Sequence, residues 1–244
     1  MDTRADPSGR PARSTDHSPA HRPAPTDQRP PAPRRGALHV VTAALLSALL
    51  AAAFLALYRW AVLSEGGQRA DIHLLVALQD LNPALGPTAT VLRPGLGVAG
   101  ALACATLGAL ALSGRRWRSL GAAVAVVAAS VGGTWALKEV LLERPYLGAY
   151  GYTVNTFPSG HVSATLALVA AAALLSPAWR TSTARWLFLL ALAAVAVAAC
   201  LASLLEHVHR PSDVVGSVLL VGSATALAIA VFRPPLLRLP GAPD

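Results

Sequence analysis

Residues 38–62, LHVVTAALLSALLAAAFLALYRWAV, form the first of several apolar runs that decide the fold of this chain. The run contains a single residue that is charged at neutral pH, Arg59. A helix needs about 20 apolar residues to cross the ~30 Å hydrocarbon core of a bilayer. The run therefore predicts a membrane-spanning α-helix.

Further along the chain, similar runs rich in Ala, Leu and Val predict an all-α polytopic membrane protein with six transmembrane helices in a bundle. Small residues on these runs allow the helices to pack closely. The run that begins at Gly160 is short, and Pro158 and Ser159 extend it at its N-terminal end. The other predicted spans are residues 88–113, 120–142, 160–175, 186–205 and 214–232.

The composition of the 244-residue chain agrees with a location in lipid. Hydrophobic residues make up 54% and charged residues 13%, whereas soluble domains carry about 25% charged residues. The net charge of +8 is typical of nucleic-acid-binding proteins too, but here the arginines gather in the N-terminal tail and in short loops, so we expect no nucleic-acid partner. Cys104 and Cys200 lie in apolar runs and are interpreted as small core residues.

The segments outside the apolar runs divide the chain into three parts. Residues 1–36 are rich in Pro, Arg, Ser and Asp and predict a disordered tail, because they offer too little apolar surface to fold. Residues 37–233 form the predicted membrane domain, and 234–244 a short tail. Between the first two spans, residues 72–81 have an amphipathic pattern that predicts a short interfacial helix.

The positions of arginine predict the topology. Cytoplasmic loops of membrane proteins carry an excess of Lys and Arg, and with six spans the arginine-rich segments all fall on one side. We therefore expect a multi-pass cell-membrane protein with both termini in the cytoplasm. The outward loops are then 63–87, 143–159 and 206–213. The arginine-rich segments are the N-terminal tail, Arg115–Arg116–Arg118, Arg180–Arg185 and Arg233–Arg238.

Three polar clusters lie at the outer ends of predicted spans. In the first, KEVLLERP at 138–145, the cationic side chains of Lys138 and Arg144 are spaced to converge on one anion. Arginine offers a planar fork that matches phosphate, and lysine a point charge. Read alone, the same two residues are equally typical of interfacial anchors.

The second cluster is PSGH at 158–161. Pro158 suits the start of a helix, and a helix N-terminus presents free backbone N–H groups to an anion. Ser159 adds a hydroxyl donor, and Gly160 lets an anion approach the backbone. His161 follows on the first turn, where it is either a functional or a merely interfacial residue.

The third cluster is HRPSD at 209–213. His209 and Asp213 are four residues apart, so they share a helix face or bridge the turn at which Pro211 starts the sixth span. In either geometry the carboxylate can hold one imidazole nitrogen and leave the other free as a nucleophile. The alternative is a helix cap formed by Ser212 or Asp213.

Together the clusters supply a nucleophile, an orienting acid, a second histidine for proton transfer and donors for phosphate oxygens. This set requires no metal and no cofactor. A zinc site of His207, His209 and Asp213 is an alternative, but no compact set of further ligands accompanies it.

The order Lys138…Arg144-Pro145, then Pro158-Ser159-Gly160-His161, then His209…Asp213 resembles the signature of the type 2 phosphatidic acid phosphatase superfamily. The resemblance covers residues 70–232. It implies a lipid phosphatase whose reaction is independent of metal. The substrate is then a phosphorylated or diphosphorylated lipid, such as phosphatidate or undecaprenyl diphosphate, held among membrane lipids at an extracytoplasmic active site.

The resemblance also implies a role for each matching residue. His209 is similar to the nucleophile that forms a phosphohistidine, and Asp213 to its orienting carboxylate. His161 is similar to the general acid that protonates the leaving group and then activates water. The implied phosphate-binding residues are Lys138, Arg144, Ser159 and Gly160.

The chain departs from the family pattern at Ser203, where the family usually has a phosphate-binding Arg six residues before the nucleophile. Besides the lipid phosphatase, a lipid phosphotransferase using the same histidine and a catalytically weak lipid-binding relative stay open, the last of these because of Ser203. Nearby, Glu206 is expected to pair with a cation, for which Arg144 is a candidate.

Overall fold

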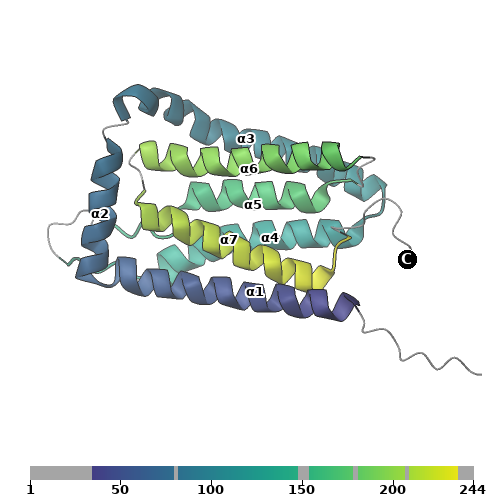
Figure 1. Ribbon diagram of the computed structural model, residues 1–244, viewed down its shortest axis with the longest axis horizontal. Coiled ribbons are helices and arrows are strands. Elements are labelled where there is room, and N and C mark those ends of the chain that lie inside the picture. Colours follow the sequence, from purple (N-terminus) through teal and green to yellow (C-terminus); the bar gives the residue numbers. More distant parts are fainter. Residues whose placement is uncertain (1–34, 80–81, 148–153, 178–180, 207–208, 236–244) are drawn as a thin grey trace, which may run out of the picture. The chain divides into compact units, whose positions relative to one another are not determined.

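Every apolar run expected to cross the membrane is helical in a computed structural model of the chain. The structure describes residues 35–79, 82–147, 154–177, 181–206 and 209–235. All regular structure in these ranges is helical, and the residues from Arg35 onward group into one unit (Figure 1). The predicted disordered tail lies outside the described residues except for Arg35 and Gly36, which begin the first helix.

Five helical segments are long and apolar enough to span a bilayer, which confirms five of the six predicted spans. Two of them end in a π-helical turn, a feature that is frequent at functional sites. The five segments are α1 (Arg35–Leu57) with η1 (Tyr58–Val62), α3 (Asn82–Ser113), α4 (Trp117–Ala136) with η2 (Leu137–Leu141), α6 (Ser182–Leu205) and α7 (Pro211–Phe232).

The helix expected as the remaining span, α5 (Gly160–Leu175), has 16 residues. At 1.5 Å per residue it is about 24 Å long, shorter than the hydrocarbon core of a typical bilayer. It contacts α3, α4, α6 and α7, and Val162, Ser163 and Ala167 on it are fully buried or nearly so. Protein therefore surrounds much of α5, and its status as a sixth span stays a prediction.

The predicted interfacial helix is present as α2 (Glu65–Gln79), longer at its N-terminal end than the pattern at 72–81 indicated. Its first turn is fixed by Ser64, whose Oγ accepts a hydrogen bond from the backbone of Gly67 at 3.1 Å. A Cβ on Gly67 would lie 1.9 Å from the carbonyl oxygen of Trp60, so only glycine fits this turn. The helix runs crosswise to α1 and α7, at the end where α5 and α7 begin (Figure 1).

An aromatic cluster fixes the segment that leads into α5. Phe157 is fully buried, and its ring lies 5.1 Å from that of Phe54 and 5.7 Å from that of Tyr58. On the α7 side it rests against Gly216, where an added Cβ would be 2.5 Å from the ring. The start of α5 is thereby held between α1 and α7.

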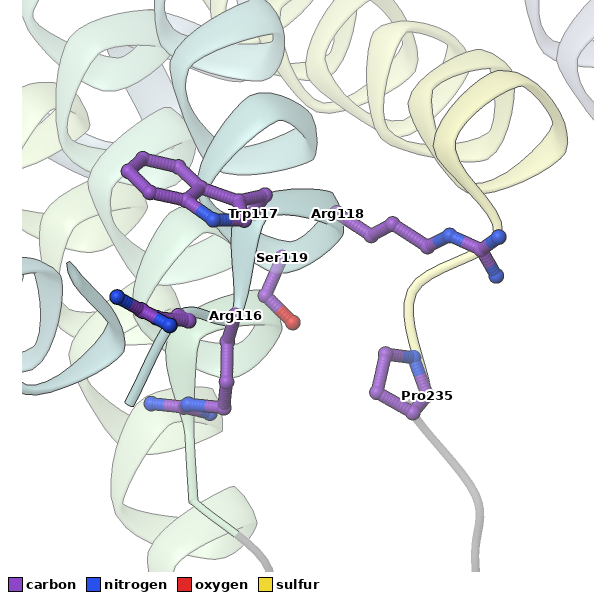
Figure 2. Close-up of a pocket in the computed structure, with 6 residues that line it drawn as sticks. Arg116, Trp117, Arg118, Ser119 and Pro235 are labelled. Carbon is purple, nitrogen blue, oxygen red and sulfur yellow. The ribbon is translucent and has the colours of Figure 1, made fainter. Parts of the chain in front are cut away.

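The N-terminal end of α4 carries the arginine-rich loop that is predicted to lie in the cytoplasm. A cleft of about 340 Å³ opens there (Figure 2). Arg116 donates hydrogen bonds to the carbonyls of Leu175 (2.7 Å) and Ser176 (2.8 Å), and so closes the C-terminal end of α5. The 25-residue span Trp117–Leu141, about 37 Å long, separates this cleft from the predicted site. The cleft is lined by Arg115, Arg116, Trp117, Arg118, Ser119 and Pro235.

Candidate active site

The second and third polar clusters meet where the N-termini of α5 and α7 come together. The backbone N–H of Ser159 donates to the carbonyl of Asp213 at 3.1 Å. The hydroxyl of Ser217, one turn further along α7, lies within hydrogen-bonding distance of the same carbonyl (2.9 Å) and of that of Ser159 (3.0 Å). Two segments that are far apart in sequence thus form one rigid junction.

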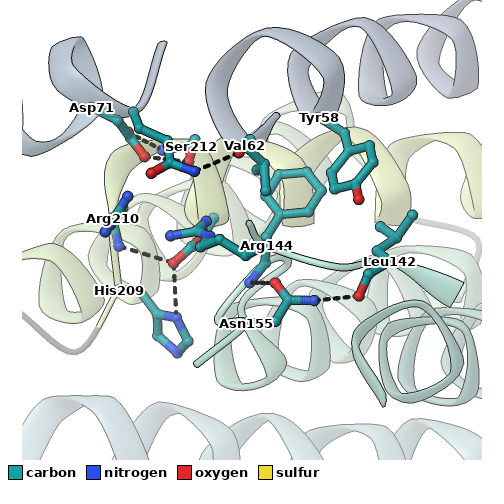
Figure 3. Close-up of polar contacts among 12 residues, drawn as sticks. Tyr58, Val62, Asp71, Leu142, Arg144, Asn155, His209, Arg210 and Ser212 are labelled. Carbon is teal, nitrogen blue, oxygen red and sulfur yellow. Dashed lines mark hydrogen bonds and ion pairs between the residues drawn. The ribbon is translucent and has the colours of Figure 1, made fainter. Parts of the chain in front are cut away.

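His209 and Asp213 bridge the start of α7, with Pro211 at the first helical position, as the sequence predicted. One carboxylate oxygen of Asp213, Oδ2, accepts the backbone N–H of Arg210 at 3.0 Å and lies 3.4 Å from Nδ1 of His209 (Figure 3). The helix-cap reading and the histidine-orienting reading are therefore both realised by one carboxylate. Nδ1 faces the acid, which leaves Nε2 as the nitrogen for chemistry.

Arg144 holds the other oxygen of that carboxylate. Its Nη2 donates to Oδ1 of Asp213 at 2.7 Å, and the two side chains are 1% and 0% exposed. Nε and Nη1 of Arg144 are also buried, and neither has a hydrogen-bond partner among the described residues. A buried donor without an acceptor costs free energy. These two nitrogens therefore indicate a binding position for an anion.

The loop that carries Arg144 is fixed by three side chains that the sequence reasoning missed. The hydroxyl of Tyr58 donates to the carbonyl of Glu143 at 2.7 Å. The amides of Gln68 and Asn155 donate to the carbonyls of Pro145 (3.0 Å) and Leu142 (2.8 Å) respectively. Tyr58, Leu142 and Asn155 surround Arg144 in Figure 3. Each of these three side chains belongs to a different segment of the chain, so no local sequence motif indicates its contact with the loop.

The N-terminus of α5 is open. Ser159 is its N-cap, and its Oγ accepts from the backbone of Val162 at 3.4 Å, which leaves the hydroxyl hydrogen available for donation. A Cβ on Gly160 would meet no atom within 4 Å. The backbone N–H groups of Gly160 and His161 lie in the first turn, where a helix offers no internal acceptor. The geometry suits an oxyanion.

His161 is exposed at this helix end. It occupies the second position of α5, in the same first turn as the open backbone N–H groups. Its role in proton transfer stays a prediction.

Lys138 is the predicted site residue that the structure does not bring into contact with the others. It lies in η2, and its backbone carbonyl accepts from Asn155 at 3.3 Å. Within the described ranges its ammonium makes no hydrogen bond or ion pair with the residues around Asp213. Its role in binding phosphate stays a prediction.

The candidate pairing of Glu206 with Arg144 is wrong. Glu206 forms its ion pair with Arg93 of α3, while Arg144 pairs with Asp213. Arg93 lies inside an apolar run, where a charged residue is itself a functional signal; the sequence reasoning did not use it. Ser203 is fully buried one turn before Glu206.

Asp71 of α2 is a further residue that the sequence did not single out. It is buried, and its two oxygens accept from the backbone N–H (2.9 Å) and the hydroxyl (2.5 Å) of Ser212. Burial raises the pKa of Asp71, and the bonds from Ser212 partly offset that rise. The contact ties α2 to the start of α7, beside His209 and Asp213 (Figure 3).

The zinc alternative requires His207, which lies outside the described residues. Within the part of the chain that the structure describes, no three His, Cys, Asp or Glu side chains form a group that could hold a metal ion.

Comparison with known proteins identifies the family of the chain. The model of the PAP2 superfamily matches residues 98–236. That is more than half of the chain, so the protein belongs to the PAP2 superfamily, and the resemblance drawn from the three motifs is confirmed. Membership implies phosphatase or phosphoryl-transfer activity on lipid-type substrates. Neither the search of curated proteins nor that of solved structures returned a match.

Proposed function

We propose that this protein hydrolyses a lipid phosphomonoester or diphosphate through a phosphohistidine on Nε2 of His209. The observation that carries the proposal is the buried chain Arg144–Asp213–His209, in which two donors of the arginine have no partner among the described residues. These donors, together with the open N-terminus of α5, suit the three non-bridging oxygens of a phosphoryl group.

In the first step the lone pair of Nε2 attacks phosphorus, and the bond between phosphorus and the lipid oxygen breaks. The acid Asp213 keeps the proton of His209 on Nδ1 and stabilises the positive charge that develops on the ring. His161 gives its proton to the leaving oxygen, which departs as an alcohol or, from a diphosphate, as a phosphate monoester.

In the second step His161 takes a proton from water while the water oxygen attacks phosphorus. The bond between nitrogen and phosphorus breaks, inorganic phosphate leaves, and both histidines return to their starting states. Throughout, Arg144, the hydroxyl of Ser159 and the first amides of α5 stabilise the charge on the phosphoryl oxygens; removal of one such donor typically costs about 10²–10³-fold in rate.

The location of the site suits a lipid substrate. His209 and Asp213 lie at the start of a candidate membrane span, so a headgroup can reach them while its acyl or prenyl tail stays in the bilayer. We further propose that α5 is the sixth span, with the arginine-rich loop at 115–118 in the cytoplasm and the active site on the outer side.

The test is phosphate release by the purified full chain in detergent, with a chelator present, from a panel of lipid phosphates. The panel contains phosphatidate, phosphatidylglycerol phosphate and undecaprenyl diphosphate. We expect release from at least one member and none above background from His209→Ala. Equal release by the parent and His209→Ala would contradict the proposal, whereas transfer of phosphate to an added alcohol would identify a phosphotransferase.

A further inference from the structure

Arg93 and Glu206 form an ion pair between α3 and α6 inside the helical bundle. Nε of Arg93 faces Oε2 of Glu206, and the side chains are 22% and 8% exposed. The two atoms meet as charges without a directed hydrogen bond, since neither has a hydrogen-bond partner among the described residues. Charged residues within a membrane span are expensive and mark functional positions more often than packing positions.

This pair belongs to the surroundings of the proposed reaction. Helix α5 packs against both α3 and α6. A Cβ on Gly97 of α3 would lie 3.9 Å from Oγ1 of Thr165 on α5, and the two helices are in contact at this level. Arg93 and His161 each lie one turn before these residues, so they occupy the same level of neighbouring helices.

The pair also lies on the face of α6 where the family pattern has an arginine and this chain has Ser203. Residues three apart share a helix face, so Ser203 and Glu206 point to the same side. Ser203 is fully buried, and its hydroxyl has no hydrogen bond among the described residues. The position therefore contributes no cation, and the guanidinium that pairs with Glu206 comes from α3.

We propose that Arg93 is the second phosphate-binding guanidinium of this enzyme, provided from α3 in place of the arginine that α6 lacks at Ser203, and that Glu206 positions it. The inference rests on the proposed phosphatase function. Glu206 contacts Nε, and the terminal amino groups of Arg93 make no hydrogen bond within the described residues. Those two groups are free to bind phosphoryl oxygens, for which the planar fork of arginine is suited.

The competing account is a purely structural ion pair. Removal of Arg93 alone leaves the carboxylate of Glu206 buried and unpaired, which would destabilise the fold whether or not Arg93 binds phosphate. The paired substitution Arg93→Gln with Glu206→Gln removes both charges and retains similar volumes. It separates the two accounts, because no unpaired charge remains.

The experiment measures two quantities on the full chain in detergent: kcat/KM for the best lipid phosphate, and the Kd of orthovanadate by calorimetry. Orthovanadate adopts the five-coordinate geometry of phosphoryl transfer, and its binding needs no turnover. We expect Arg93→Ala and the paired variant each to lose about tenfold or more in both quantities, as for a lost charge-assisted contact. Ser203→Arg in the Arg93→Ala background should recover part of both losses.

Arg118→Ala is the matched control, since it removes one exposed guanidinium from the opposite end of α4; we expect changes within about twofold. Parental kcat/KM and Kd in the paired variant, or no orthovanadate binding by the parent, would overturn the inference. If the parent releases no more phosphate than His209→Ala, the proposed function fails, and the orthovanadate comparison still decides the role of Arg93.

Discussion

Two helix N-termini meet at the candidate site, and they differ in negative charge: one carries its own carboxylate and the other carries none. At the start of α7, Asp213 occupies the helix end with its own carboxylate, which accepts the backbone N–H of Arg210 and pairs with Arg144. At the start of α5 the first turn has no acidic residue, and the space over Gly160 is open.

The two helices therefore use the positive end of the helix dipole differently. A helix N-terminus attracts negative charge. In α7 that charge is built into the chain, where it fixes the cap, the arginine and the histidine in one arrangement. In α5 it has to come from outside. We therefore expect the filled terminus to organise the nucleophile and the empty terminus to receive the phosphate of the substrate.

The largest effect is expected from Asp213→Asn, which removes the internal anion of α7. The variant should lose about 10³–10⁴-fold in kcat, because the tautomer of His209 is no longer fixed. It should also lose about 3–5 kcal/mol in the free energy of unfolding, because Arg144 remains buried without its partner. Activity assays and denaturant unfolding in detergent measure the two effects.

The control is Asp71→Asn, the same substitution at a buried carboxylate of α2 that contacts Ser212 but not His209. It should retain most of the activity. A similar loss of activity in the two variants would show that Asp213 acts through the fold alone.

A smaller effect, on activity without stability, is expected from Gly160→Ala at the empty terminus. The added methyl group meets no protein atom, and alanine favours the helix, so the free energy of unfolding should be unchanged or rise by up to about 1 kcal/mol. The methyl group enters the space assigned to phosphate, so kcat/KM should fall about tenfold.

The matched glycine is Gly216, where a Cβ would press on the ring of Phe157. Gly216→Ala should cost about 1–3 kcal/mol in stability, as overpacking does. Thermal unfolding and kcat/KM distinguish the pair: Gly160→Ala should lower kcat/KM without lowering stability, whereas Gly216→Ala should lower stability. Parental activity in Gly160→Ala would argue against phosphate binding at this helix end.

The helices were predictable from sequence, and so was the pairing of His209 with Asp213, because both depend on residues close along the chain. Apolar runs specify spans wherever lipid is the solvent, and Pro211 marks the start of α7. The length of α5 was readable too, whereas the contacts that surround it were not.

The remaining contacts were out of reach for a physical reason. Arg144 is 69 residues from Asp213 and Asp71 is 141 residues from Ser212. An ion pair or hydrogen bond across such a separation depends on which helices are neighbours. The hydrophobic periodicity of the sequence does not show which helices these are. Glu206 is an example. Its sequence neighbourhood predicts a cationic partner, but only the packing of α3 on α6 identifies that partner as Arg93.

The smallest effect concerns the pH dependence of stability at Asp71, which anchors α2 beside the filled terminus. Burial raises the pKa of this carboxyl in the folded protein. The folded state then binds the proton more tightly than the unfolded chain does. The contribution of the protonated carboxyl to the stability of the fold is therefore complete below the pKa of the unfolded chain, about 3.9. That contribution is lost as the pH rises through the folded pKa.

Asp71→Asn abolishes this dependence. The stability of the parent relative to the variant should fall as the pH rises above about 3.9, as measured by unfolding in detergent at several pH values. A difference that grows with pH would mean that Ser212 stabilises the ionised carboxylate more than burial disfavours it.

The most direct test of the account is to find the phosphoryl group on the protein during turnover. The full chain is mixed with its lipid phosphate, quenched in alkali within milliseconds to seconds, and digested for mass spectrometry; phosphohistidine survives alkali. We expect phosphate on His209 in the parent and none in His209→Ala; in His161→Ala, which lacks both proton transfers, the phosphohistidine should form and disappear more slowly than in the parent. Turnover by the parent without a phosphorylated histidine, or with phosphate on another residue, would contradict the mechanism.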